Sequence, residues 1–275
     1  MMSLDGKHIG FIGAGAMASA LAGGLRTAGI PSERIFASDP DARRRDAVSK
    51  DLGIAVGDDN AELAARSDVV VIAVKPNIVT EAVGAARAAG VDVERPVWIS
   101  IAAGVTLARL EAAIGGSPRV VRAMPNTPAL VGAGATAFCA NRQAGPEDSG
   151  AARALFEAVG VCWEAPDEGM LDAVTGLSGS GPAYVFLLLE ALAEAGVAQG
   201  LPEEAAAELA SQTVFGAAKL ARESDKSPAA LREQVSSPGG TTVAGLEHLR
   251  EGRFPETVVG AVAVATARSR ELGVR

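Results

Sequence analysis

The sequence is poor in the side chains that metal centres, disulfide frameworks and base-stacking surfaces require. Among its 275 residues it has two histidines (His8, His248) and two cysteines (Cys139, Cys162), too few for a His-rich metal site or a set of disulfides. Aromatic residues make up only 4%, which leaves few side chains to stack on nucleic-acid bases. We therefore expect no bound metal, buried free thiols and a core of aliphatic side chains.

Basic residues are also in the minority. With 25 basic and 33 acidic residues the net charge is −8, which repels phosphate backbones and acidic membranes. The longest apolar run, 183–189, ends at Glu190 and is far shorter than the ~20 residues that span a bilayer. Residues 1–7 lack the apolar stretch of a secretion signal. These features predict a cytoplasmic protein that binds neither nucleic acid nor membrane.

The first part of the chain alternates short apolar runs with alanine-rich segments. Apolar runs without strict polar alternation are typical of parallel strands that are covered on both faces. We expect strands at 7–12, 34–38, 68–74, 97–101 and 119–123, and helices between them, for example at 16–28, 41–51, 60–66 and 77–89. This alternation predicts an α/β fold with a Rossmann-like, doubly wound, mostly parallel sheet.

The second part of the chain contains no convincing strand. Helical patterns cover 180–199, about 202–222 and 254–271, so we place a boundary near Pro166. The predicted domains are a dinucleotide-binding domain at 1–166 and an all-helical domain at 167–275. Residues 184–189 are apolar on every side of their helix, and such a helix must be surrounded. We favour a dimer interface there; the alternative is the central helix of a single bundle.

A glycine motif follows the first predicted strand. Residues 13–18 read G-x-G-x-x-A and open the first helix. The glycines permit a tight turn and let backbone N–H groups approach a pyrophosphate at the helix N-terminus. The motif alone is weak, because glycine turns without a ligand are common. In its strand–turn–helix context it predicts dinucleotide binding.

The end of the second predicted strand leaves the choice between NAD and NADP open. Asp39 lies where an acidic residue binds the ribose of NAD. Arg43–Arg45 follow it, either to reach the 2′-phosphate of NADP or to form a solvated helix face. Lys75 ends the strand at 68–74, where side chains face the ligand crevice of such a sheet, although an exposed loop lysine is the alternative. Asn60 begins the preceding helix and is a candidate for the adenosine side.

The motif VSSPGGTT at 235–242 suits a small carboxylate. Its Pro-Gly-Gly interrupts one helix, and Thr241 and Thr242 begin the next, whose N-terminus attracts an anion. The alternative is a plain helix–loop–helix corner with Thr as the N-cap. The small-residue corner SGSGP at 178–182 is open to the same two interpretations.

Six segments together resemble pyrroline-5-carboxylate reductase. They are FIGAGAMA (11–18), AVKP (73–76), SIAAGVTL (100–107), RAMPNTPALVGAG (122–134), TGLSGSGPAYVF (175–186) and VSSPGGTTVAGL (235–246). They follow the family's order over both parts of the chain, and the last two are the most specific. The resemblance implies hydride transfer from a nicotinamide to 1-pyrroline-5-carboxylate, which gives L-proline in the last step of proline biosynthesis. It also implies a homodimer or a higher homo-oligomer built from dimers.

The resemblance further implies which residues form the site. Thr242 matches the threonine that hydrogen-bonds the ring nitrogen of the substrate, and it is the candidate catalytic residue. The implied cofactor is NADP, with NAD possible because Asp39 stands where the family often has Ser, Thr or Asn. The implied substrate contacts are Val235, Ser236, Ser237, Gly239, Gly240, Thr241 and Thr242. The implied cofactor contacts are Gly13, Ala14, Gly15, Ala16, Met17, Ser38, Asp39, Asn60, Ala73, Val74, Lys75, Pro76, Ala102 and Ala103.

Two other functions remain as alternatives. A related NAD(P)-dependent hydroxyacid dehydrogenase would use a lysine of the helical domain as acid and base. Lys219 and Lys226 are the lysines there, and neither lies in a glycine-rich corner. A non-catalytic NADP-sensing protein would not need the second anion site that VSSPGGTT provides.

Overall fold

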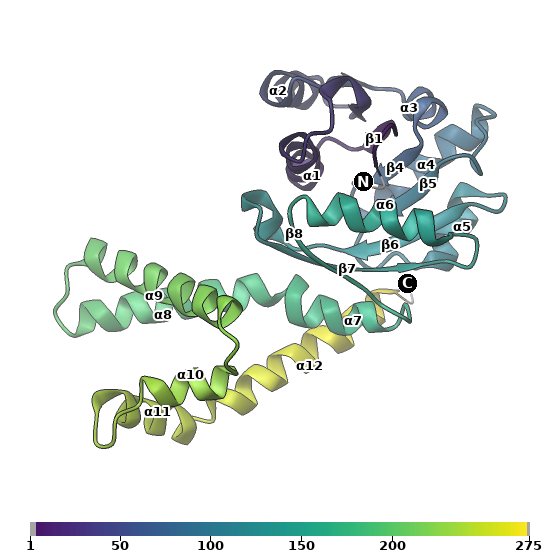
Figure 1. Ribbon diagram of the computed structural model, residues 1–275. Helices are drawn as coiled ribbons and strands as arrows, with labels where there is room; N and C mark the ends of the chain where they lie inside the picture. The colour runs from purple at the N-terminus through teal and green to yellow at the C-terminus, as the bar shows by residue number, and fades with distance from the viewer. Residues whose placement is uncertain (1–3, 274–275) are drawn as a thin grey trace. The chain divides into compact units, whose positions relative to one another are not determined.

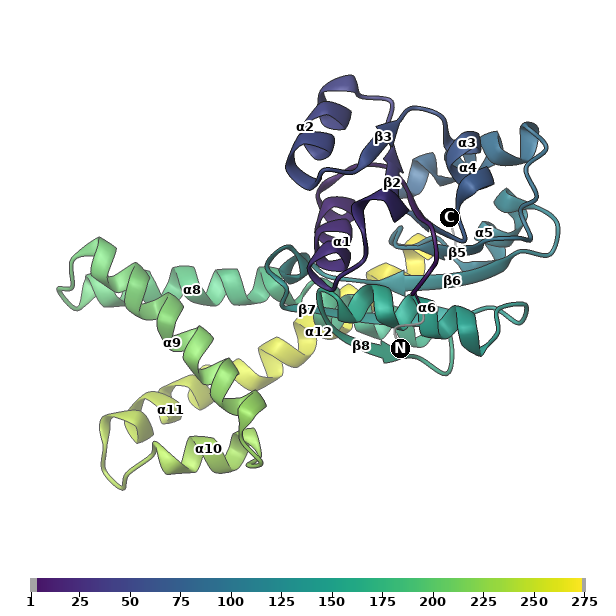
Figure 2. The same cartoon turned by 45° about the horizontal axis from the view of Figure 1, so that its top comes forward.

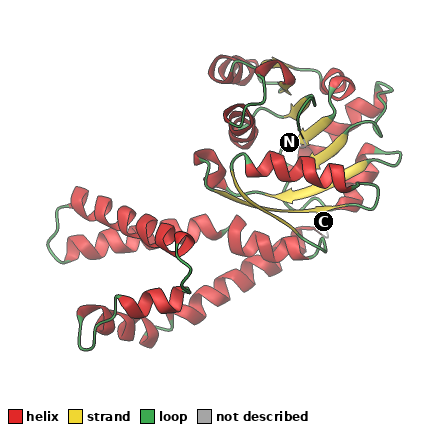
Figure 3. Cartoon of the chain, viewed as in Figure 1, coloured by secondary structure: helices red, strands yellow, loops and turns green. Residues whose placement is uncertain are grey.

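The computed structural model describes residues 4–273 and divides into two compact units (Figure 1). One unit comprises Met1–Ser180 together with Val264–Arg275, and the other comprises Gly181–Ala263. The predicted absence of a secretion signal concerns residues 1–7, of which 1–3 lie outside the described residues. Figure 3 shows the strands in the first unit and helices throughout the second. The predicted order, an α/β part followed by an all-helical part, is confirmed.

The first unit is built around one eight-stranded sheet with the order β3-β2-β1-β4-β5-β6-β7-β8. Neighbouring strands are parallel, except that β6 and β7 are antiparallel. The predicted doubly wound, mostly parallel sheet is therefore confirmed. The strands are β1 (Ile9–Ile12), β2 (Ile35–Ser38), β3 (Ala55–Gly57), β4 (Val69–Ile72), β5 (Val97–Ser100), β6 (Arg119–Met124), β7 (Gly134–Ala140) and β8 (Gly160–Glu164).

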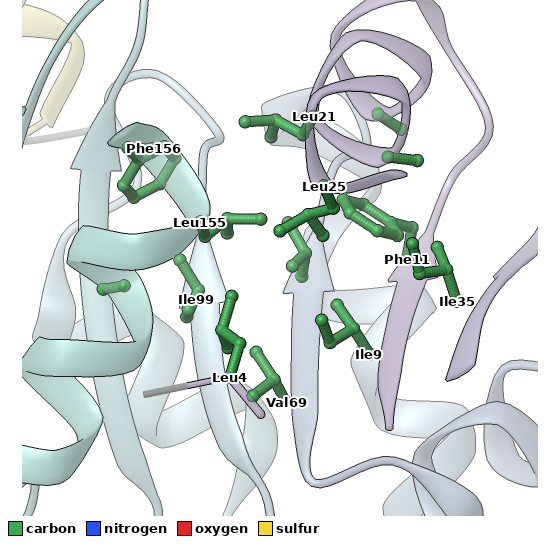
Figure 4. Packing of buried hydrophobic residues seen from close by; sticks show 14 of the residues in the cluster. Leu4, Ile9, Phe11, Leu21, Leu25, Ile35, Val69, Ile99, Leu155 and Phe156 are labelled. Atoms are coloured by element: carbon green, nitrogen blue, oxygen red, sulfur yellow. The ribbon is translucent and has the colours of Figure 1, made fainter. Parts of the chain in front are cut away.

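Helices cover both faces of this sheet. Buried residues of α1 (Ala16–Thr27), α2 (Ala42–Leu52) and α6 (Pro146–Glu157) join the core on one face. Those of α3 (Asn60–Arg66), α4 (Val79–Ala88), α5 (Leu107–Ile114) and α7 (Met170–Val174) join the core on the other. Figure 4 shows Phe11, Leu21, Leu25 and Phe156 packed on the first face, each 1% exposed or less. Burial on both faces explains why the central strands read as continuous apolar runs.

The first compact unit extends beyond the predicted boundary near Pro166. Leu171 of α7 is fully buried against the sheet, and Ser269 of α12 (Phe254–Gly273) donates a hydrogen bond to Asp172 Oδ1 at 2.6 Å. The first compact unit therefore continues to Ser180 and includes the end of α12. The division into a cofactor-binding domain at 1–166 and a substrate-binding and dimerisation domain at 167–275 stays a prediction.

The second unit consists of helices, and Figure 2 shows α8 (Gly181–Ala198) and α9 (Glu203–Glu223) paired as a hairpin. α10 (Pro228–Gln234) and α11 (Thr241–Glu251) follow, and α12 begins there. α8 has no buried residue, and Leu187 is 67% exposed. The alternative of a central bundle helix therefore does not hold within this chain. In the described part, Met170–Ala198 is long and apolar enough to cross a membrane, by length and composition only.

Candidate functional site

The sheet order places the glycine loop at a topological switch point. β1 lies between β2 and β4; the chain leaves β1 for α1 on one face of the sheet and leaves β4 for α4 on the other. A crevice at the carboxyl ends of the strands forms at such a point, and it is where ligands bind in open α/β sheets. The loop at 13–18 and the segment at 73–76, both candidate cofactor contacts, follow the two strands that flank this point.

Gly13 cannot be replaced without strain. Its φ is +97°, and a Cβ there would lie 2.7 Å from the carbonyl oxygen of Ala73. Its N–H donates to the carbonyl of Ser38 at 2.7 Å, which ties the loop to the end of β2. Gly15 is the N-cap of α1, and no acidic residue stands in the first turn of that helix. No carboxylate of α1 itself therefore meets the positive end of its dipole, which attracts anions.

Asp39 lies inside the protein against this loop. It is 4% exposed, and its carboxylate accepts hydrogen bonds from the N–H of Ala14 (2.9 Å), the N–H of Asp41 (3.0 Å) and Arg44 Nη1 (3.1 Å). Burial raises the pKa of the carboxyl, but these bonds and the charge of Arg44 outweigh it and hold the pKa below its ordinary value of 3.8. The carboxylate therefore joins the glycine loop to the start of α2.

We expect Asp39→Asn to lower the free energy of unfolding by about 1.5–3 kcal/mol at pH 7, because a charge-assisted set of hydrogen bonds is lost. The folded-state pKa is depressed, so this stability is present above the unfolded pKa and is lost as the pH falls through the folded one. The difference between wild type and variant should shrink below about pH 4. Urea unfolding from pH 7 to 3.5 measures it, with the exposed Asp41→Asn as control. A difference that does not change with pH would contradict the prediction.

The arginines after Asp39 have separate roles. Arg45 Nη1 donates to the carbonyls of Asp39 (2.9 Å) and Pro40 (3.0 Å), and its side chain is 23% exposed. It therefore fixes the turn between β2 and α2, and the interpretation as a purely solvated helix face is wrong for this residue. Arg44 pairs with the Asp39 carboxylate but stays half-exposed, so an anion can reach it.

Ser38 and Asn60, both predicted cofactor contacts, meet beside the same loop. Ser38 Oγ donates to Asn60 Oδ1 at 2.6 Å, and Asn60 Nδ2 donates to the carbonyl of Ala82 at 3.0 Å. Lys75 is exposed at the start of the 3₁₀ turn η2 (Pro76–Ile78). Ala102 is buried, and Ala103 is exposed in the turn that follows β5. These residues come from the carboxyl ends of neighbouring strands, or begin helices next to them.

The predicted substrate loop lies in the second unit between α10 and α11. Gly239 has a φ of +71°, and the N–H of Gly240 donates to the carbonyl of Ser237 at 2.9 Å. Gly240 is the N-cap of α11 and offers no side-chain bond, so the alternative of Thr as the N-cap is wrong. Thr241 and Thr242 are the first two helical residues. The first N–H groups of a helix have no partner within it, and this end of a helix attracts anions such as a carboxylate.

Comparison with known proteins identifies the family. A model of the pyrroline-5-carboxylate reductase dimerisation domain matches residues 168–272. The enzyme of that name from Synechocystis is 46% identical, with 97% of this chain and 98% of the relative covered. The chain belongs to the pyrroline-5-carboxylate reductase family. The pea (Pisum sativum) reductase is 44% identical, with 98% and 97% covered. A model described as NADP oxidoreductase, coenzyme F420-dependent, matches residues 8–104.

Solved structures of pyrroline-5-carboxylate reductases share the whole fold. The enzyme from Coxiella burnetii superposes with a TM-score of 0.92 at 38% identity, covering 97% of this chain and 98% of that one. The Plasmodium falciparum enzyme, solved with NADP bound, gives a TM-score of 0.85 at 34% identity, covering 98% and 99%. The resemblance seen in six sequence segments is thus confirmed.

This family member offers neither a metal cluster nor a reactive thiol in its described part. Residues 4–273 contain no group of three His, Cys, Asp or Glu side chains that could hold a metal ion. Cys139 and Cys162 are free, Cys139 buried and Cys162 half-buried, and burial raises the pKa of Cys162 to about 12. A thiolate nucleophile at neutral pH is therefore unsupported.

The sequence did not reveal the polar side chains that fix β6 and the residues after it. Arg122 Nη1 pairs with Glu168 Oε1 at 2.6 Å, and the same oxygen accepts the N–H of Leu107 at the start of α5. Asn126, which follows β6, is buried and bonded through both ends of its amide. The segment RAMPNTPALVGAG carried part of the resemblance, but its spacing gave no sign of these partners.

Proposed function

We propose that the protein reduces 1-pyrroline-5-carboxylate to L-proline by hydride transfer from NADPH, with NADH as a usable substitute. One observation carries this proposal: a chain of this family has both a glycine loop at the switch point of its sheet and an α11 N-terminus capped by glycine alone. The first suits a dinucleotide pyrophosphate and the second a small carboxylate. The alternatives, a hydroxyacid dehydrogenase and an NADP sensor, do not use both features.

The cofactor supplies the hydride when it is bound, and the protein orients the reactants. We assign the pyrophosphate to the glycine loop at 13–17, through its N–H groups at 15–17, because those of Gly13 and Ala14 bond Ser38 and Asp39. We assign the adenosine ribose to the group formed by Ser38, Asp39 and Asn60. The segment at 73–76 and the turn at 102–103 line the crevice toward the nicotinamide. Each assignment rests on position at the carboxyl edge of the sheet.

The substrate carboxylate is assigned to the loop at 235–242. The Thr242 hydroxyl accepts a hydrogen bond from the protonated ring nitrogen, which is the catalytic role proposed for this residue. Hydride then adds to the imine carbon, and the C=N electron pair passes to nitrogen, which becomes the amine of proline. A protonated imine is already electrophilic, so the site needs no general acid with a shifted pKa.

The test of this function is oxidation of NADPH, followed by absorbance, with and without 1-pyrroline-5-carboxylate. We expect imine-dependent oxidation that yields proline, and slower or weaker turnover with NADH measured alongside. Oxidation of 2-hydroxyacids with NADP⁺ would favour the dehydrogenase alternative. Tight NADPH binding without turnover of either substrate would favour the sensor.

We expect Asp39→Ser to raise the NADPH-to-NADH ratio of kcat/KM about tenfold, because one like-charge contact with the 2′-phosphate is removed. The variant also releases Arg44, whose Nη1 now lies 3.1 Å from the Asp39 carboxylate. Asp41→Ser is the matched control, since it removes an exposed carboxylate two residues away and keeps a good N-cap for α2. If the ratio stays unchanged in Asp39→Ser, Asp39 does not face the ribose.

We also infer a cytoplasmic homodimer, or a larger assembly of dimers, that binds neither nucleic acid nor membrane. The apolar, uncovered α8 lies within the residues that match the dimerisation model, which supports a second subunit over a bilayer as its cover. The net charge of −8 supports the absence of polyanionic partners.

A further inference from the structure

A distorted helical turn lies where the chain leaves the first unit at Ser180. Between α7 and α8 the residues Thr175–Gly179 form a π-helix, η4, and the N–H of Ser180 donates to the carbonyl of Thr175 at 2.8 Å, five residues earlier. Thr175 Oγ1 and Ser178 Oγ each donate to the carbonyl four residues before them. Such back-bonding bends helices, and single π-helical turns are frequent at functional sites.

Pro182 deprives one carbonyl of this turn of its usual backbone hydrogen-bond donor. In a regular α-helix the carbonyl of Ser178 would accept the N–H of residue 182, but proline has no N–H. The side chain of Asn126 takes that place: its Nδ2 donates to the Ser178 carbonyl at 3.0 Å. Asn126 is 9% exposed, so this donor replaces a lost backbone bond away from solvent.

The other end of the same amide fixes Asn126 to the sheet. Its Oδ1 accepts the N–H of Ala135 in β7 at 2.9 Å. One end must accept and the other must donate, so the amide has a single workable orientation. Met124 at the end of β6 packs against Gly179 of the turn. A Cβ at Gly179 would lie 2.6 Å from the Met124 methyl group. The turn is thus held at the carboxyl end of β6.

This edge of the sheet belongs to the candidate site. β6 pairs with β5, and β5 leads into the turn at 102–103 that we assign to the crevice. The Arg122–Glu168 pair ties β6 to a residue two positions before α7. We propose that Asn126 is a positioning residue of the reductase: its amide stands in for the N–H that Pro182 lacks and holds the turn at 175–180 against the carboxyl end of β6. The effect on catalysis rests on the proposed function.

Asn126→Asp is the main test. It keeps the shape and the acceptor for Ala135, but it turns a carboxylate oxygen toward the Ser178 carbonyl in place of a donor. We expect kcat/KM for the imine to fall about tenfold while the Kd of NADPH is unchanged. In hydrogen exchange, the Ser180 amide should exchange faster than in wild type.

Asn141→Asp is the matched control at the opposite end of the same strand pair. Asn141 is 8% exposed; its Oδ1 accepts the N–H groups of Val120 and Ala144, and its Nδ2 donates to the carbonyl of Pro118 and to Glu111 Oε1. Because the new carboxylate in Asn141→Asp would face the Glu111 carboxylate, this control tests a change at least as disruptive as Asn126→Asp. This variant should lower the melting temperature without a selective loss in kcat/KM and without faster exchange at Ser180. Equal kinetic losses in the two variants would overturn a role specific to Asn126.

Pro182→Ala supplies the rescue arm, because alanine restores an N–H at position 182. Asn126→Asp should cost less than about threefold in that background, and the double variant should fold even where the single one does not. A tenfold loss in both backgrounds, or failure of both to fold, would overturn the proposal. If the wild type shows no imine turnover, the proposed function fails. Hydrogen exchange at Ser180 still tests the role of Asn126, because an unchanged rate in Asn126→Asp would overturn that role.

Discussion

Thr242→Ala is expected to lower kcat/KM for 1-pyrroline-5-carboxylate by roughly tenfold to a hundredfold and to leave the Kd of NADPH unchanged. Thr242 is the second residue of α11, and the glycine N-cap two positions before it contributes no side-chain bond. Its hydroxyl, with that of Thr241 before it, therefore lies in the first turn of that helix, where no N-cap side chain competes for a ligand. Loss of one hydrogen bond to a charged iminium costs about 1.5–3 kcal/mol. Steady-state kinetics with varied imine at saturating NADPH measures the effect.

Thr257→Ala is the control for this experiment. Thr257 is exposed on α12, and its hydroxyl only donates back to the carbonyl of Arg253. Both variants replace a threonine by alanine in a helix of the second unit. A difference in kcat/KM between them therefore comes from where the threonine lies, and not from the loss of a threonine as such. An unchanged kcat/KM in Thr242→Ala would remove this residue from the mechanism, and an equal loss in both variants would point to a loss of helix stability.

The second large effect is expected from Leu187→Asp, which should convert the assembly into monomers and abolish most of the imine reduction. Leu187 is 67% exposed on α8, a helix that has no buried residue within its own chain. Stable dimer interfaces of obligate type bury more than ~2,000 Å², and a carboxylate placed in one is left without a partner. Analytical ultracentrifugation at nanomolar concentration measures the assembly.

Gln199→Asp is the matched control for the assembly experiment, because it adds the same charge at an exposed polar position just after α8. This variant should sediment as wild type does. A wild-type chain that is monomeric, stable and active at nanomolar concentration would refute the shared interface. So would a Leu187→Asp variant that stays a dimer.

The central strands were predictable because burial on both faces makes their sequences distinctive. Val69–Ile72 and Val97–Ile99 lie in the middle of the sheet, where strands covered on both faces read as apolar runs. β7 and β8 escaped prediction: GATAFCA is rich in small residues, and GVCWE is an edge strand with Trp163 half-exposed. Their strand conformation follows from pairing with β6 and with each other, which is information that no local pattern contains.

The candidate site was predictable in its loops but not in its side-chain partners. Gly13 is required by a positive φ and a close approach of Ala73, and that requirement is visible in the motif. The direction of the Asp39 carboxylate was not, because spacing places a residue at the end of a strand and does not say which N–H it meets. The bond from Asn126 to the Ser178 carbonyl spans 52 residues of sequence and arises only once β6 and the π-helical turn are assembled.

The return of α12 to the sheet makes the helical unit an insertion within the α/β unit. Ser269 reaches Asp172 across 97 residues of sequence, and the whole of Gly181–Ala263 is synthesised between the two. Contacts so far apart in sequence are slow to form, and a chain emerging from the ribosome folds from its N-terminus. The eight strands leave the ribosome well before Val264–Arg275 does. Synthesis of the end of α12, and not emergence of the last strand, is therefore what supplies the final part of the first unit.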